Sequence, residues 1–149
     1  MAALVLPALK RHWEHPTSSP GTSAATAANP LAWSPANENG TQETLAVGFA
    51  IPVYADGVTI RETEGNGFVT AVDVLPDGAD PNTGWVNVWT GIDPTLPGAP
   101  ADFRVNWTET PYQVSAVRIH VDTNHNLNTY EDIDSVQLHG WFSRFSARV

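Results

Sequence analysis

The feature that most limits the fold of this chain is a series of short segments rich in β-branched and aromatic residues, which are separated by Gly, Pro, Asn or Asp. β-Branched and aromatic residues favour strands, and the separating residues favour turns. No segment has the length and period of an ordinary helix. We therefore predict an all-β fold of eight strands: residues 44–49, 57–62, 68–75, 85–90, 101–107, 113–122, 135–139 and 142–149.

Alternation within the strands predicts which side chains face the core, because successive side chains of a strand point to opposite faces of the sheet. In one segment Val117, Ile119 and Val121 share an apolar face, while Arg118 and His120 share a polar one. We expect two antiparallel sheets packed around one apolar layer, a β-sandwich. The same argument points Val58, Ile60, Val136 and Leu138 inward, and Thr59, Arg61, Gln137 and His139 outward.

The beginning of the chain differs in composition from the rest. Residues 16–35 are rich in Pro, Ser, Thr, Ala and Gly and have neither helical nor strand period, which is typical of an irregular arm or long loop. With 149 residues, 42% of them hydrophobic, the chain has material for one domain with a core. We predict an irregular arm over residues 1–25, which can include the first strand, and one domain over residues 26–149.

Charge limits the partners of the protein. Seven basic and sixteen acidic residues give a formal net charge of −9, which disfavours nucleic acids and anionic membranes. Neutral sugars, cations and basic proteins remain. The absence of cysteine excludes disulfides and thiolate metal sites. No apolar run is long enough to span a membrane, and the run at residues 2–6 lacks the preceding basic residues of a signal peptide.

Several motifs, in their order along the chain, resemble the galactose-binding-like jelly roll. They are AWSP at residues 32–35, TLAVGFAIPVYADGVTIRETEGNGFVTAVDV at 44–74, WVNVWTG at 85–91, DFRVNW at 102–107 and EDIDSVQLHG at 131–140. More narrowly, they are similar to the discoidin-related (F5/8 type C-related) modules that accompany pappalysins, some F-box proteins and many bacterial surface proteins.

The resemblance spans about residues 26–140. It implies an eight-stranded antiparallel jelly-roll β-sandwich, usually non-catalytic, which holds ligands on the loops at one end and often a structural calcium ion nearby. Two features depart from the family. The region before residue 26 is proline-rich where a first strand is usual, and the segment WFSRFSARV, residues 141–149, continues past the expected end.

The segment 122–134 carries oxygen-bearing side chains at alternate positions, an arrangement that suits a hard cation. It is not an EF-hand, because Leu127 and Ile133 stand where that loop needs glycine and glutamate. The alternative is an Asn-rich turn whose side chains cap their own backbone. The resemblance also places a calcium-binding acid near the last strand. The predicted calcium ligands are Asp122, Asn124, Asn126, Glu131 and Asp134.

Five side chains are candidates for ligand contacts: Trp33, Arg61, Asn66, Asn124 and Tyr130. Aromatic rings stack on the apolar faces of sugars, and an arginine fork or an amide binds hydroxyl groups. Each residue also has an ordinary alternative. A tryptophan is often part of the core, an arginine often forms a surface ion pair, and Asn66 lies between two glycines of a predicted turn.

Motifs of the common enzyme classes are missing from the sequence, including the nucleophile elbow, the Walker loop and the dinucleotide fingerprint. A glycosidase would need two carboxylates, such as Glu62 with Glu131 or Asp134, and nothing in the sequence brings them together. We therefore expect a non-catalytic module for carbohydrate recognition or adhesion, outside the cell or at its surface.

The alternative function is a structural subunit that assembles into a surface layer or filament through the arm and the segment 141–149. The two functions differ in what these ends contact. Ends that fold back onto the domain favour the binding module, whereas ends that reach a neighbouring copy favour the structural subunit.

Overall fold

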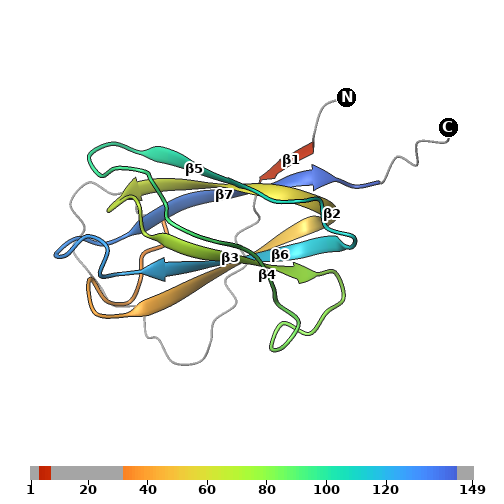
Figure 1. Ribbon diagram of the computed structural model, residues 1–149, viewed down its shortest axis with the longest axis horizontal. Coiled ribbons are helices and arrows are strands. Elements are labelled where there is room, and N and C mark those ends of the chain that lie inside the picture. The colour runs from red at the N-terminus through yellow and green to blue at the C-terminus, as the bar shows by residue number, and fades with distance from the viewer. Residues whose placement is uncertain (1–3, 8–31, 144–149) are drawn as a thin grey trace.

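The computed structural model describes residues 4–7 and 32–143, and in these residues it is all-β, with seven strands and no helix (Figure 1). All strand pairs are antiparallel. These residues contain no helix long and apolar enough to cross a membrane. The strands are β1 (Leu4–Pro7), β2 (Gln42–Glu64), β3 (Val69–Pro76), β4 (Val86–Thr90), β5 (Ala101–Asn106), β6 (Gln113–Asp122) and β7 (Asp132–Trp141).

The long strand β2 organises the sheet. The strand order is β1-β7-β2-β6-β3-β4, and β5 also pairs with β2. Residues 42–48 of β2 pair with β6, whereas its second half pairs with β7 and β5. The β2–β6 register shifts between Gly48 and Val53, a stretch that contains Pro52, which cannot donate a backbone hydrogen bond. The sheet curls at β2, so that its two halves enclose one core (Figure 1).

The core confirms the predicted inward faces. Val58, Ile60, Val117, Ile119, Val121, Val136 and Leu138 are all buried, as is Phe68. Arg118 and His120 are half-buried on the opposite face of β6. The prediction for His139 was wrong, because this side chain is 6% exposed and its Nε2 lies 2.7 Å from the Thr59 hydroxyl. Alternation gives the face on which His139 lies, but its exposure depends on the side chains beside it on that face, such as Thr59.

The strand boundaries differ from the eight predicted. The segments 44–49 and 57–62 belong to one strand, β2, because the chain changes partners at the bend without leaving the sheet. The predicted arm contributes β1, which pairs with β7. Phe142 and Ser143 follow β7 without being in a strand, and residues 144–149 lie outside the described residues, as do residues 8–31 of the arm and its junction with the domain.

Candidate functional site

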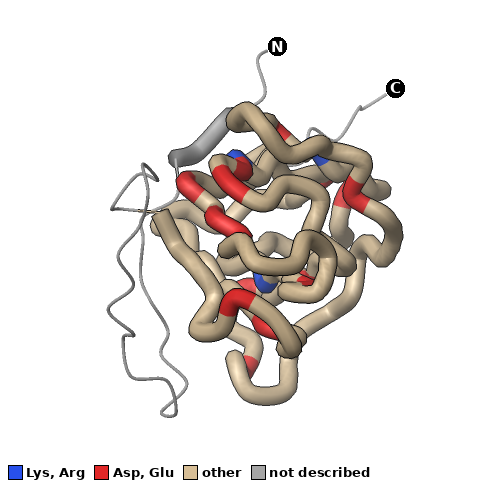
Figure 2. The backbone as a smooth tube through the Cα atoms, turned by 90° about the vertical axis from the view of Figure 1, so that its left-hand side faces the viewer, with Lys and Arg blue, Asp and Glu red and all other residues tan. Residues whose placement is uncertain are grey.

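Four segments meet at one end of the sheet and form what we call the loop end: residues 32–43, 62–68, 91–100 and 122–132 (Figure 2). Asn66 Nδ2 donates to the Ala99 carbonyl at 2.8 Å, and the Gly40 amide donates to Asn124 Oδ1 at 3.0 Å. Two further bonds run from Asn128 N to Asn39 Oδ1 and from Thr129 Oγ1 to Glu64 Oε1. Each of these bonds joins two segments, so together they hold the loop end as one surface.

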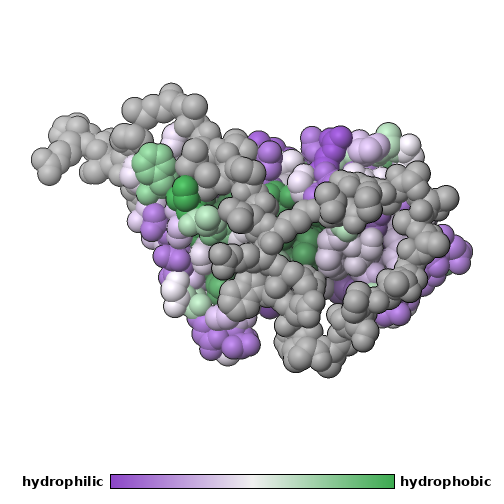
Figure 3. Space-filling view, turned by 180° about the vertical axis from the view of Figure 1, so that it is seen from behind, coloured by the Kyte–Doolittle hydropathy of each residue, from purple (hydrophilic) through white to green (hydrophobic). Residues whose placement is uncertain are grey.

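The loop end is strongly acidic. It contains eight of the chain's sixteen acidic residues and neither lysine nor arginine. Figure 2 looks onto this end and shows acidic residues around it, and Figure 3 shows that hydrophilic residues predominate there on the face seen from behind. Such a surface attracts cations and cationic groups. The acids are Glu38, Glu43, Glu62, Glu64, Asp93, Asp122, Glu131 and Asp132.

Two of these acids, Glu62 and Asp93, lie against each other at the rim of the core. Glu62 is 0% exposed and Asp93 is 4% exposed. The Thr95 hydroxyl lies 2.6 Å from Glu62 Oε2 and 2.7 Å from Asp93 Oδ1. Backbone amides add two bonds, from Gly67 to Glu62 Oε2 at 2.9 Å and from Thr95 to Asp93 Oδ1 at 3.0 Å. These bonds join the end of β2, the turn at 65–67 and the segment 91–100.

The pKa of the Glu62 carboxyl reflects this enclosure. Burial is the largest cause and, together with the contact with Asp93, raises the pKa to about 8 against opposing hydrogen bonds from Thr95 and Gly67. A proton bound by Glu62 removes the repulsion between the two carboxylates. The raised pKa therefore favours a protonated Glu62 at neutral pH when no other positive charge is present.

Glu131 is the third buried acid of the loop end. It is 0% exposed, and neither of its carboxylate oxygens has a hydrogen-bond partner. Burial is the largest cause and, with the charges of Asp122, Asp132 and Glu43, raises its pKa to about 8, while the residue's own backbone amide acts in the opposite direction. A buried carboxyl group without partners is rare in folded proteins and calls for an explanation.

Two glycines allow the turn at the loop end. Gly65 and Gly67 have φ values of 66° and 98°, a region that L-residues with a side chain rarely adopt. A Cβ on Gly65 would lie 2.5 Å from the Tyr130 carbonyl oxygen, and one on Gly67 would lie 2.6 Å from His125 Nε2. The turn predicted here is confirmed, and it packs directly against the segment 122–132.

The predicted calcium ligands lie partly together. Asp122 Oδ1 accepts a hydrogen bond from the Asn124 backbone amide at 2.9 Å, as the alternative of a backbone-capping turn requires, whereas Asn124 Oδ1 accepts from the Gly40 amide of another segment. Glu131, by contrast, has both oxygens unpartnered. Among residues 4–7 and 32–143, no three His, Cys, Asp or Glu side chains form a metal cluster. Asn126 and Asp134 are both partly buried, and calcium binding by the five residues stays a prediction.

The five predicted ligand contacts are in different environments. Trp33 is half-buried, packs against the core and pairs its backbone with Ile133. Arg61 forms a surface ion pair with Asp102 at 3.0 Å, which is its ordinary alternative. Asn66 is 1% exposed, whereas Asn124 is exposed and Tyr130 half-buried. The loop end thus contains four of the five, and Arg61 directly precedes it.

Asp93 and Thr95 were not among the residues predicted from the sequence. The only local signal was Asp-Pro-Thr, a sequence typical of a turn in which an aspartate accepts the amide two residues later. That turn forms, as the bond from Thr95 to Asp93 shows. Its contact with Glu62 depends on how β2 and the segment 91–100 pack, which no local pattern contains.

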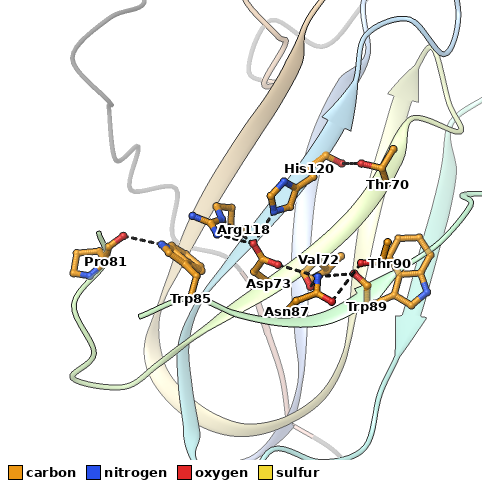
Figure 4. Close-up of polar contacts among 10 residues, drawn as sticks. All are labelled: Thr70, Val72, Asp73, Pro81, Trp85, Asn87, Trp89, Thr90, Arg118 and His120. Carbon is orange, nitrogen blue, oxygen red and sulfur yellow. Dashed lines mark hydrogen bonds and ion pairs between the residues drawn. The ribbon is translucent and has the colours of Figure 1, made fainter. Parts of the chain in front are cut away.

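A second polar cluster lies on the outer face of β3, β4 and β6, with Asp73 at its centre (Figure 4). Asp73 Oδ2 accepts two bonds from Arg118, at 2.9 and 2.7 Å, and lies 2.6 Å from His120 Nε2. Asn87 Nδ2 donates to Asp73 Oδ1 at 3.0 Å, and the Arg118 guanidinium lies 4.7 Å from the centre of the Trp85 ring. Both oxygens of Asp73 are thus occupied, so this cluster joins strands and the loop end is the better candidate site.

Comparison of the chain with models of protein families and with curated proteins finds no match.

Proposed function

We propose that the protein is a non-catalytic binding module that recognises a glycan or another surface ligand through the loop end. The observation that carries the proposal is the set of hydrogen bonds that join the four segments of this end. A surface that is already ordered loses less conformational entropy when a ligand binds. Its exposed amides and half-buried tyrosine are groups that fix hydroxyl-rich ligands.

The finer fold in this proposal is the galactose-binding-like jelly roll, in its discoidin-related form. Antiparallel pairing throughout, the curled sheet and the single core support it. Except for AWSP, which lies before β2, the motifs that carry the resemblance fall largely on the described strands β2, β3, β4, β5 and β7. Function in this family is implied to reside in loops at one end, without catalysis, and fold alone does not identify the ligand.

Calcium is part of the proposed function. We place it with Glu131 and the predicted partners Asp122, Asn124, Asn126 and Asp134. The two unpartnered oxygens of Glu131 support this, because carboxylate oxygens are ligands that calcium prefers. The excess of acid at the loop end also supports a bound cation. A calcium-assisted adhesion module would act outside the cell or at its surface.

The structural subunit is the alternative proposal, and the exposed Phe142 at the end of β7 favours it. An exposed phenylalanine that follows an ordered strand is a natural contact for another molecule. The pairing of β1 with β7 in the same chain supports the binding module instead. An arm that completes its own sheet is not available for strand exchange.

The proposal is tested by retention of the purified protein on a panel of insoluble and soluble polysaccharides, with calcium and with a chelator. We expect selective retention that Tyr130→Ala reduces at least about tenfold, the loss of one good contact. Thr108→Ala, an exposed position at the opposite end, should leave retention unchanged. Trp33→Ala is unsuitable, because this side chain packs against the core. Absence of retention on every polymer, with large assemblies in sedimentation, would favour the structural subunit.

A further inference from the structure

We propose that Glu62 and Asp93, together with the amide oxygen of Asn66 and the hydroxyl of Thr95, form a buried site for a divalent cation of the calcium class. These side chains are different from those predicted to bind calcium in the segment 122–134. The site lies where the end of β2, the turn at 65–67 and the segment 91–100 meet. It does not depend on glycan binding.

Two oxygens of the proposed site have no hydrogen-bond partner in the protein. Glu62 Oε1 and Asn66 Oδ1 have no hydrogen-bond partner, and their side chains are 0% and 1% exposed. Buried polar atoms in folded proteins nearly always have a partner, because an unmade bond costs stability. The Asn66 amide nitrogen is held by the Ala99 carbonyl, which fixes the side chain next to the segment that carries Asp93 and Thr95.

The number of hydrogens available shows that Thr95 and the two carboxylates need one further positive charge, which a bound cation can supply in place of a proton. The Thr95 hydroxyl has one hydrogen, yet it lies within 2.7 Å of an oxygen of each carboxylate. It can donate to only one of them. The remaining contacts, between Thr95 and the second carboxylate and between the two carboxylates, require another hydrogen or a cation that all these oxygens can bind.

The atoms that the four side chains offer indicate which kind of cation the site would bind. All four side chains offer oxygen, which suits hard cations and not the softer metals that prefer sulfur or imidazole. Two carboxylates balance the charge of a divalent ion. The exposure of Glu62 and Asp93, 0% and 4%, leaves little room for the water that magnesium usually retains. Calcium accepts neutral oxygens and irregular geometry, so two carboxylates with an amide and a hydroxyl group match it best.

The experiment uses the whole protein, freed of metal with a chelator and titrated with calcium chloride in a calorimeter, without any glycan. We expect saturable binding with a Kd of order 10⁻³ M or tighter, as in extracellular calcium modules. Calcium at one hundred times the Kd should raise the Tm by about 5–10 °C.

Variants of single residues show whether the calcium binding measured in the calorimeter takes place at the proposed site. Asp93→Asn should weaken the binding at least about tenfold, since it removes a charged ligand. The matched control Asp102→Asn changes an exposed aspartate outside the loop end and should leave the affinity unchanged. Glu131→Gln should also retain this binding, which separates it from the calcium proposed for Glu131.

Two results would overturn the proposal: no calcium binding by the wild-type protein up to about 10 mM, ten times the weakest expected Kd, or wild-type affinity in Asp93→Asn. If Asp93→Asn does not fold, Thr95→Val replaces it, because the hydroxyl is also a proposed ligand and valine has a similar shape. Unchanged calcium affinity in a folded Thr95→Val protein would then count against the site. Polysaccharide retention is measured separately, so either proposal can fail while the other stands.

Discussion

The cluster around Asp73 leads to a prediction with a calculable magnitude. Asp73→Asn keeps the size of the side chain but removes its charge. Three side chains, Arg118, His120 and Asn87, bond to the carboxylate. A hydrogen bond to a charged group contributes about 1.5–3 kcal/mol. The Arg118 and His120 side chains are 31% and 32% exposed, so water can replace part of what they lose. We expect a loss of about 2–4 kcal/mol in the free energy of unfolding.

The assay is equilibrium unfolding in urea at neutral pH, with Asp102→Asn as the matched control. Both aspartates pair with an arginine, but the Asp102 side chain is 58% exposed and that of its partner Arg61 41%. An exposed ion pair contributes about 0–1 kcal/mol, so the control should lose no more than that. A loss for Asp73→Asn no larger than for Asp102→Asn would refute the reasoning, because burial would then have no effect on the value of the pair.

Acid provides a second check on the same variant. Burial raises the pKa of Asp73, but hydrogen bonds from His120, Asn87 and Arg118 outweigh it and leave the pKa below its usual value of 3.8. A depressed carboxyl pKa contributes stability above the unfolded pKa, and this contribution is lost as the pH falls through the folded pKa. The difference between wild type and Asp73→Asn should therefore shrink below about pH 4. A difference that stays constant into strong acid would contradict the assignment.

Gly67→Ala should cost more than about 2 kcal/mol in urea unfolding, because it combines a positive φ with a close contact, whereas Gly98→Ala, with φ 114° and nothing within 4 Å, should cost about 1 kcal/mol; equal losses would contradict the contact. Phe68→Ala should cost about 3–5 kcal/mol, since its side chain is 0% exposed, and a loss below about 1 kcal/mol would contradict its place in the core. Burial lowers the pKa of His139 below 6.5, so the unfolded chain binds a proton first and stability should fall as the pH drops below that value. His139→Gln should remove this part of the pH dependence, and an unchanged profile between pH 7 and 5 would count against it.

The sequence determined the strands and their inward faces, because both follow from local properties. β-Branched residues, turn residues and a period of two act within a few positions. Val117, Ile119 and Val121 were predicted to be buried and are. The turn at 65–67 was also predictable, since two glycines mark a backbone that other residues adopt only with strain.

Only the tertiary structure decided which strands are neighbours, and with it the fate of the polar side chains. β2 is one strand because its second half finds new partners in β7 and β5 after the bend, and β1 could not be assigned before it paired with β7. Alternation put His139 on the outer face, but burial depends on what covers that face. Glu62 meets Asp93 because two segments about thirty residues apart pack together. Their contact excludes solvent, which raises the pKa of the Glu62 carboxyl. Exclusion of solvent is a property of the assembled fold and not of the local sequence.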